Sequence, residues 1–183
     1  MTIAHTGDPV AAGIAAILEA QGASAVLHDD PGHLVATGAA DVAIGDALGY
    51  ARHLGIADIG LIPNVALLLD GFSGYLRLLF RPGSENLQRI AMEDPLSTAG
   101  VVAGLLLIEK HEIEPTIVQA ASEDSIDKIL EETDGLLVVG AQAVETTAAG
   151  RHGLDLADEW LDVTEGPLPY LLAWGAVDRV DDP

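Results

Sequence analysis

The chain has 183 residues, enough for one sizeable hydrophobic core or for two small lobes that share a hinge. Hydrophobic residues make up 49% of it, which excludes an intrinsically disordered chain. There is no cysteine, so disulfide bonds, thiolate zinc sites and a cysteine nucleophile are excluded. The formal net charge of −21 predicts no binding to nucleic acid or to an anionic membrane surface, because both need clustered lysine and arginine.

The sequence also bears on the compartment. The stretch from Met1 to His5 has no basic segment followed by a long apolar run, as a secretory signal peptide would have. The most apolar stretch, Val101 to Ile108, is far shorter than the roughly 20 residues needed to cross a bilayer. With no cysteine in the chain, these features predict a soluble cytoplasmic protein.

Short apolar segments alternate with helical ones, a pattern typical of βαβ units and a largely parallel sheet. The first expected helix ends at Gly22. On one of its faces it carries the apolar residues Val10, Ile14, Ile17 and Leu18. Strands are expected at Thr2 to His5, Ala23 to His28 and Asp41 to Gly45, and further helices at Gly32 to Thr37 and from about Ala47 to Leu54.

A glycine-rich segment, Gly71-Phe72-Ser73-Gly74, separates two apolar strands that we expect to be buried, Val65 to Leu69 and Leu76 to Phe80. Such a break between strands predicts a hinge. Beyond it the alternation restarts, with strands at Ile90 to Met92, Thr116 to Val118 and Leu136 to Val139, helices at Ser97 to Lys110 and from about Glu123 to Glu132, and a late apolar run at Tyr170 to Trp174.

Two βα blocks around a hinge, followed by a late returning strand, predict two lobes with a cleft between them. The first lobe is expected to comprise residues 1–70 and 166–183, and the second residues 71–165. Clefts of this kind bind small ligands at the carboxyl ends of strands, where helix N-termini point toward the ligand.

Five groups of segments carry a resemblance to a known family. The most specific is Asp155-Leu156-Ala157-Asp158-Glu159-Trp160, followed by Leu168-Pro169-Tyr170. The others are Gly38-Ala39-Ala40-Asp41-Val42-Ala43-Ile44 with Tyr50-Ala51-Arg52, Leu78-Leu79-Phe80 with Leu87-Gln88-Arg89-Ile90-Ala91-Met92-Glu93, Glu114-Pro115, and Asp134-Gly135-Leu136-Leu137-Val138-Val139-Gly140. Over most of the chain from about Leu34 onward, these segments resemble the chorismate dehydratase family of the futalosine route to menaquinone.

The resemblance implies an α/β, two-lobed fold of the periplasmic-binding-protein type II kind, with a hinge and an interlobe cleft. It implies a cytoplasmic lyase that removes water from chorismate to give 3-[(1-carboxyvinyl)oxy]benzoate, and no cofactor is expected. Such a reaction needs a group that takes a ring proton, help for the departing hydroxyl and donors for two carboxylates. The partner would be a small anionic, chorismate-like metabolite. A homodimer is left open.

Two residues are the expected catalytic groups. Where the family has an asparagine in its first strand-to-helix loop, this chain has Asp8, which could serve as the base or simply cap the helix that begins at Pro9. In the hinge the family has a serine at the position of Leu76. Ser73 is the nearest replacement, and its alternative role is that of a hinge residue.

Five further residues are expected to bind the substrate. Asp46 stands where the family has Pro-Ser after a strand, and Gly74 belongs to the glycine-rich hinge. Ser97 and Thr98 begin a helix, where they would bind a carboxylate or cap the helix. Gln142 follows a strand after which the family has Gly-Asp, so an acid is missing here.

These departures leave other functions open. One is a non-catalytic relative that binds a small anion with the same fold. Another is a folded remnant, because the chain stops soon after Trp174 whereas family members carry further helices, which a partner or a second copy would then supply. Trp160 and Trp174 themselves are expected to be packing anchors.

Two other constellations have competing interpretations. A metal site at the cluster formed by His28, Asp29, Asp30 and His33 is less favoured than a solvated turn, so no metal is expected. Arg77, in the strand after the hinge, would pair with a substrate carboxylate if it faced the cleft, but strand alternation equally allows it to point outward.

Overall fold

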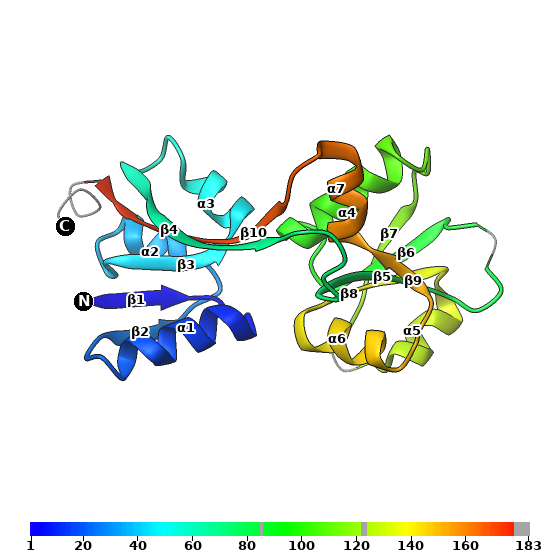
Figure 1. Cartoon of the computed structure of the whole chain (residues 1–183), viewed down its shortest axis with the longest axis horizontal. Coiled ribbons are helices and arrows are strands. Elements are labelled where there is room, and N and C mark those ends of the chain that lie inside the picture. Colours follow the sequence, from blue (N-terminus) through cyan, green and yellow to red (C-terminus); the bar gives the residue numbers. More distant parts are fainter. Residues whose placement is uncertain (85, 122–123, 178–183) are drawn as a thin grey trace. The chain divides into compact units, whose positions relative to one another are not determined.

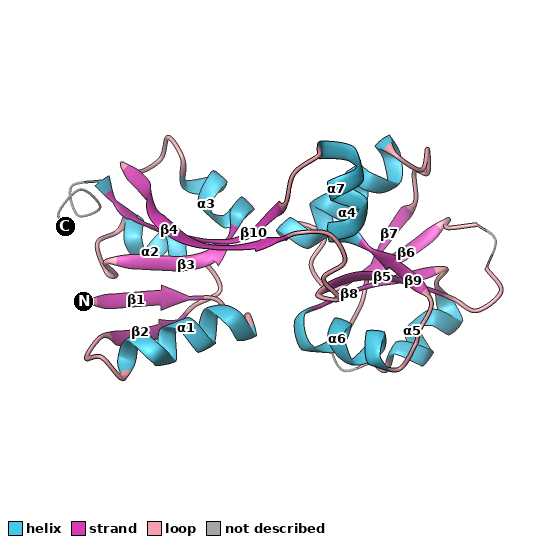
Figure 2. Cartoon of the chain, viewed as in Figure 1, coloured by secondary structure: helices cyan, strands magenta, loops and turns pink. Residues whose placement is uncertain are grey.

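The computed structural model describes residues 1–84, 86–121 and 124–177. The chain forms two compact units (Figure 1). Unit 1 comprises Met1–Leu68 and Pro169–Pro183, and unit 2 comprises Leu69–Leu168. Each unit is built on one five-stranded sheet with helices packed against it (Figure 2).

The strands of the unit 1 sheet lie in the order β2-β1-β3-β10-β4. Strand β1 runs parallel to its neighbours β2 and β3, and β10 runs antiparallel to β3. The elements are β1 (Thr2–His5), α1 (Pro9–Glu19), β2 (Ser24–Leu27), α2 (Pro31–Ala36), β3 (Val42–Asp46), α3 (Ala47–His53), β4 (Ile59–Leu69) and β10 (Leu168–Ala176).

The core of unit 1 forms around the indole of Trp174. This side chain is fully buried and packs in one cluster with Ala4, Val35 and Ala43. A Cβ at Gly45 would lie 2.9 Å from Cη2 of Trp174, so the strand beside the indole has no room for a side chain there. Trp174 is therefore confirmed as a packing anchor.

The strands of the unit 2 sheet lie in the order β7-β6-β8-β5-β9. Strand β6 runs parallel to β7 and β8, whereas β5 runs antiparallel to β8 and β9. The elements are β5 (Leu76–Phe80), β6 (Arg89–Met92), α4 (Thr98–Glu109), β7 (Thr116–Gln119), α5 (Ile126–Glu132), β8 (Gly135–Val139), α6 (Gly140–Ala148), β9 (Gly153–Asp155) and α7 (Leu156–Thr164).

Helices cover the unit 2 sheet through alternate strand residues. Leu79 of β5 and Val138 of β8 are buried in one cluster with Leu130 of α5 and Ala143 of α6. Helix α4 packs on α7 as well as on β8. Strand β8 and, apart from Arg77, strand β5 are consequently apolar along their length, as strands covered on both faces are.

An ion-pair cluster joins the end of α4 to α7. One Glu159 oxygen lies 2.9 Å from both Nζ of Lys110 and Nε2 of His111. Lys110 also donates to Asp162 at 2.8 Å. The hydrogen bonds to Asp162 and Glu159 raise the pKa of the Lys110 ammonium above its ordinary value.

The expected strands and helices are largely confirmed, but one expectation about burial is wrong, and one apolar residue of a predicted helix face lies outside the core. Ile17 is 62% exposed, because α1 turns the small residues Ala11 and Ala15 into the core instead. Strand β4 lies at the edge of its sheet and is not buried: Val65 is 38% exposed and Leu68 is 52% exposed.

One helix boundary differs from the expectation, and three elements were not expected at all. Helix α5 begins at Ile126 with Ser125 as its N-cap, and the expected start at Glu123 lies outside the described residues. Sequence patterns assigned no helix to α6 or α7 and no strand to β9. In the described part of the chain, no helix is both long and apolar enough to cross a membrane.

Two glycine substitutions test this packing in opposite directions. A Cβ at Gly153 would overlap the backbone oxygen of Leu78 and lie 2.9 Å from Cα of Leu79, so Gly153→Ala should destabilise the protein by about 1–3 kcal/mol. A Cβ at Gly104, inside α4, would meet no atom within 4 Å, so Gly104→Ala should stabilise by about 0.5–1 kcal/mol. Urea unfolding of both variants measures the two effects, and equal effects would contradict the packing described.

Candidate functional site

Chain topology brings the predicted residues of unit 1 to one edge of its sheet. Strands β1 and β3 are parallel neighbours, and each is followed by a helix. Asp8 lies at the start of α1 and Asp46 at the start of α3, so both carboxylates lie at the carboxyl edge of the sheet. Ligands of open α/β sheets bind at this edge.

Asp8 is the N-cap of α1. Its Oδ1 accepts hydrogen bonds from the backbone N–H groups of Val10 at 2.8 Å and Ala11 at 3.3 Å. Asp8 therefore caps α1, which is one of the two roles that the sequence left open. The side chain is partly exposed, and its role as a base stays a prediction.

Asp46 is the N-cap of α3 in the same way. Its Oδ1 accepts a hydrogen bond of 2.6 Å from the N–H of Gly49. A Cβ at Gly49 would lie 2.8 Å from that oxygen, so the glycine allows this close approach. Asp46 thus holds the start of α3, and its role in substrate binding stays a prediction.

A third carboxylate at this edge was assigned no role in the site from the sequence. Asp30 is the N-cap of α2 and accepts a hydrogen bond from the N–H of His33 at 3.1 Å. Helices α1, α2 and α3 therefore each begin on an aspartate of the chain itself. Because helix N-termini attract negative charge, an external anion at this edge would have to compete with these carboxylates.

Asp30 also pairs with a buried histidine. Nε2 of His53 lies 2.9 Å from Oδ1 of Asp30, and a Cβ at Gly32 would overlap the imidazole. Burial raises the pKa of Asp30, but the hydrogen bonds from His53 and the His33 backbone outweigh burial, so the pKa lies below its ordinary value of 3.8. No sequence pattern marked His53, because its partner lies 23 residues away.

In unit 2 the predicted residues also gather at the carboxyl edge. Strand β5 runs antiparallel to β8, so the residues just before β5 lie where β8 ends. Ser73 and Gly74 precede β5, Gln142 follows β8, and Ser97 and Thr98 follow β6, which is parallel to β8. The five residues thus share one edge of one sheet.

Ser73 and Gly74 are held by a carboxylate that sequence analysis gave no role in the site. Oδ2 of Asp155 accepts hydrogen bonds from the N–H of Gly74 at 2.6 Å and of Ser73 at 3.2 Å. The Ser73 hydroxyl lies 3.4 Å from both Asp155 oxygens and accepts a hydrogen bond from the N–H of Tyr75 at 3.1 Å. Ser73 is therefore bonded within the loop that precedes β5, and its roles as a hinge residue and as a catalytic group stay predictions.

Ser97 caps α4. Its hydroxyl donates to the backbone oxygen of Asp94 at 2.7 Å and accepts a hydrogen bond from the N–H of Gly100 at 3.1 Å. Thr98 is buried, with 5% of its surface exposed. Ser97 thus caps α4, as one of its two expected roles required. Carboxylate binding by Ser97 and Thr98 stays a prediction.

Gln142 lies in the exposed first turn of α6. Within the described residues no side chain caps this helix, which begins at Gly140 with a positive φ of 62°. The N–H of Gly140 donates to the backbone oxygen of Tyr75 at 2.8 Å. The N–H groups after it remain available for water or a ligand.

Arg77 does not take the outward orientation that the sequence left open. It is 5% exposed, so it does not point outward into solvent. Its guanidinium donates to Oγ1 of Thr147 at 3.3 Å and to the backbone oxygens of Arg151 at 3.1 Å and Gly153 at 3.3 Å. These bonds hold the segment between α6 and β9, so Arg77 acts inside unit 2.

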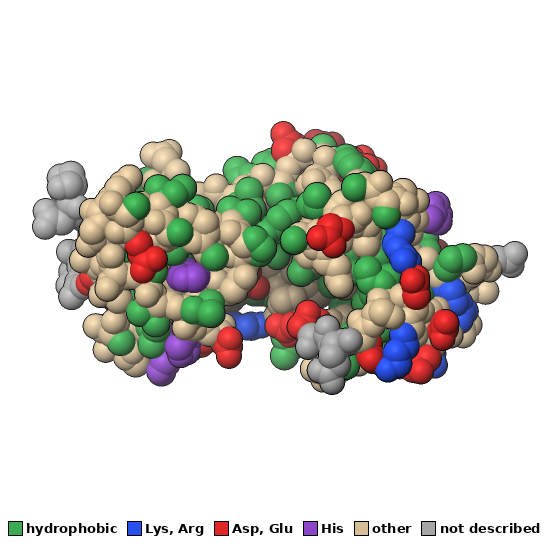
Figure 3. All heavy atoms as spheres, turned by 90° about the horizontal axis from the view of Figure 1, so that it is seen from below, with side chains coloured by type: hydrophobic (Ala, Val, Ile, Leu, Met, Phe, Trp, Pro, Cys, Tyr) green, Lys and Arg blue, Asp and Glu red, His purple; other side chains and the backbone are tan. Residues whose placement is uncertain are grey.

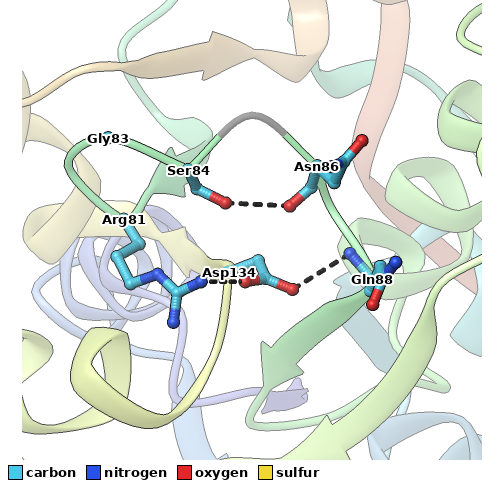
Figure 4. A pocket seen from close by; sticks show the side chains of 6 residues that line it. All are labelled: Arg81, Gly83, Ser84, Asn86, Gln88 and Asp134. Atoms are coloured by element: carbon cyan, nitrogen blue, oxygen red, sulfur yellow. Dashed lines mark hydrogen bonds and ion pairs between the residues drawn. The ribbon is translucent and has the colours of Figure 1, made fainter.

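A cavity of about 360 Å³ lies at the opposite edge of the unit 2 sheet (Figure 4). Nη2 of Arg81 donates to Oδ1 of Asp134 at 2.5 Å, and Oδ2 of Asp134 accepts hydrogen bonds from the N–H groups of Gln88 and Arg89, both at 3.0 Å. The lining contains none of the predicted residues and consists of Arg81, Gly83, Ser84, Asn86, Gln88 and Asp134.

Basic side chains on the surface of unit 2 lie beside acidic ones (Figure 3). Arg151 donates to Asp127 at 2.8 Å and Lys128 to Asp124 at 2.5 Å, as Arg81 does to Asp134. In the described ranges, no group of three or more His, Cys, Asp or Glu side chains is arranged to hold a metal ion.

Comparison with solved structures shows the class of fold. The chain is similar to protein AF1704 from Archaeoglobus fulgidus, with a TM-score of 0.75, 21% identity and coverage of 97% of this chain and 68% of that one. It is also similar to an ABC transporter protein from Parabacteroides distasonis (TM-score 0.67, 12% identity, 97% and 66% covered). The periplasmic aliphatic sulphonate binding protein SsuA from Escherichia coli is similar as well, with a TM-score of 0.67, 11% identity and coverage of 99% of this chain and 66% of that one. The fold is that of the periplasmic-binding-protein type II-like proteins.

Comparison with family models identifies the family. A model described as menaquinone biosynthesis matches residues 2–179. The chain therefore belongs to this menaquinone biosynthesis family. No curated protein matches the sequence.

The pair formed by Asp30 and His53 predicts a pH dependence of stability. The pKa of Asp30 is lower in the folded than in the unfolded chain, so the pair stabilises the fold above pH 3.8, and this contribution is lost as the pH falls through the folded-state pKa. The effect should be small, because 54% of the Asp30 side chain is exposed. Asp30→Asn keeps the cap, so urea unfolding between pH 6 and 2 should show a shallower acid loss than in the wild type. Parallel curves for the two proteins would contradict this.

Proposed function

We propose that this protein removes water from chorismate to give 3-[(1-carboxyvinyl)oxy]benzoate, a lyase step in menaquinone biosynthesis. The observation that carries the proposal is the family match over residues 2–179. Further support comes from the topology, because the predicted residues of each unit lie at the carboxyl edge of its sheet.

The reaction is a loss of water that makes the ring aromatic. A base takes a ring proton, and the electrons of that C–H bond form the new double bond of the ring. The bond from the ring to its hydroxyl breaks, and the departing oxygen takes up a proton, the one that the base removed or one from solvent, and leaves as water. Asp8 is the proposed base, since its carboxylate is fixed by two backbone N–H groups and is partly exposed. Ser73 is proposed to assist the departing hydroxyl.

The charges at the two sheet edges suggest which unit binds the carboxylates of the substrate. Chorismate carries two carboxylates, and the helices of unit 1 already begin on aspartates, so the donors for the substrate would come from unit 2. The uncapped first turn of α6 with Gln142, and the start of α4 with Ser97 and Thr98, supply such donors. Gly74, without a side chain, leaves space at the same edge.

A second function is a non-catalytic protein that binds a small anion with the same fold. One observation favours it: both proposed catalytic side chains have structural partners. Asp8 caps α1, and Ser73 is bonded within the loop that precedes β5. In that case the donors of unit 2 would bind the anion, and no bond would be broken.

Chorismate turnover by the purified protein tests the first function, with Asp8→Asn as the decisive variant. Asparagine is as good an N-cap as aspartate but is not a base, so kcat should fall about 10²–10⁴-fold while the unfolding midpoint stays unchanged. Loss of chorismate and appearance of the aromatic enol ether are followed together. Asp30→Asn, the same change at the start of α2, is the matched control and should retain wild-type turnover.

Three outcomes separate the functions. Turnover that Asp8→Asn leaves unchanged would remove Asp8 as the base while keeping the lyase. A folded wild-type protein that leaves saturating chorismate unchanged would exclude the lyase. Equilibrium dialysis with chorismate then tests the second function: the wild type should bind it, and Gln142→Ala should weaken binding about tenfold, the effect of losing one charge-assisted hydrogen bond.

A further inference from the structure

The buried carboxylate of Asp155 does more than cap a helix. Its Oδ1 accepts hydrogen bonds from the N–H groups of Ala157 at 3.0 Å and Asp158 at 3.3 Å, which completes the N-cap of α7. Its Oδ2 instead binds the N–H groups of Gly74 and Ser73, which are 81 and 82 residues away in the sequence. Capping α7 does not require the additional hydrogen bonds from Gly74 and Ser73.

We propose that Asp155 is the positioning residue of the carboxyl edge of unit 2. Its carboxylate fixes the segment from Gly71 to Gly74 and, through Tyr75, the start of α6, so that Ser73 and Gln142 keep fixed places. Asp155 is 5% exposed and acts through these residues rather than on the ligand. This inference rests on the proposed function for the nature of the ligand, a small anion such as chorismate.

The restraint comes mainly from the backbone N–H groups. At 2.6 Å the bond from Gly74 is short, as charge-assisted hydrogen bonds are, and the bond from Ser73 is 3.2 Å long. The Ser73 hydroxyl lies farther away, at 3.4 Å from each oxygen, and contributes less. The carboxylate therefore fixes the backbone of the loop, and the hydroxyl follows.

The loop transmits this restraint to α6. The backbone oxygen of Tyr75 accepts the N–H of Gly140 at 2.8 Å, and Gly140 is the first residue of the uncapped helix. Gly74 has a positive φ of 66°, and a Cβ on it would lie 3.5 Å from Oγ1 of Thr147, so the loop passes close to the far end of α6. Asp155, the loop and the start of α6 thus form one connected network.

The network requires a carboxylate at this position. Donors converge on Asp155 from two sides, α7 on Oδ1 and the loop on Oδ2, and only a carboxylate accepts on both sides. An asparagine would turn its NH₂ group toward one of these sets, where donor would face donor. Arg77, also 5% exposed, is the register partner of Asp155 between β5 and β9.

Asp155→Asn therefore tests the proposal with nearly unchanged volume. The matched control is Ser125→Ala, which removes the N-cap of α5 in the same unit, where the Ser125 hydroxyl accepts the N–H of Lys128 at 3.3 Å. In Asp155→Asn the single amide oxygen can serve only one of the two donor sets, and as a good N-cap it stays on α7, so the bonds to the loop are lost. In Ser125→Ala a cap is lost and the loop is untouched. Amide hydrogen exchange at Gly74 and Gly140 is measured in the full chain, together with kcat and KM for chorismate.

We expect Asp155→Asn to raise exchange at Gly74 and Gly140 at least tenfold over Ser125→Ala, and to raise the KM for chorismate at least fivefold. A merely structural role would lower the fraction of active protein, so kcat would fall while KM stayed constant. Unchanged exchange at Gly74, or an unchanged KM, would overturn the proposal.

Two further measurements keep the test decisive. If the wild type does not turn over chorismate, the proposed function fails, and exchange at Gly74 and Gly140 alone decides whether Asp155 fixes the loop. If Asp155→Asn does not fold, the wild-type protein still tests the bond. Gly74 should exchange at least 100-fold more slowly than an unstructured glycine amide, and exchange near the unstructured rate would overturn the inference.

Discussion

The first N–H groups of every helix need acceptors, and this requirement shapes the carboxyl edges of both sheets. In the described part of the chain, α6 alone begins without a side-chain cap, whereas aspartate or serine supplies the acceptor elsewhere. The same residues that build the strand-to-helix turns therefore occupy the places where a ligand anion would bind. Only the N–H groups and side chains that are not used for helix capping remain available to a ligand.

The two units differ in the residues that cap their helices. In unit 1 aspartates cap α1, α2 and α3, so this edge is negative and suits a base better than an anion site. In unit 2 the caps nearest the predicted residues are the neutral hydroxyl of Ser97 and the carboxylate of Asp155, which is buried beneath the loop. The uncapped α6 then presents N–H groups at an edge without an exposed carboxylate cap.

Sequence patterns predicted the strands and helices well where an apolar run is bounded by turn or capping residues, as in β5 and α4. They failed where tertiary context decides. Ile17 has the right spacing for the core face of α1, but two alanines pack there because they allow the helix to approach the sheet closely. Strand β4 is as apolar as a central strand but lies at an edge. The pairs of Asp30 with His53, and of Asp155 with Gly74, join residues that are far apart in the sequence, so no local pattern marks them.

The resemblance and the chemistry rest on different residues. In the most specific segment, Asp155 binds the loop before β5, Leu156 is 1% exposed, and Glu159 binds Lys110 and His111 at the end of α4. Each of these side chains holds unit 2 together, and a substitution in any of them would be costly whatever the ligand. The residues at the open edges, such as Asp8 and Gln142, are less constrained by packing and differ from the family pattern. Family membership is therefore recorded in the residues that build the fold, while activity depends on a few edge residues that can change without loss of that fold.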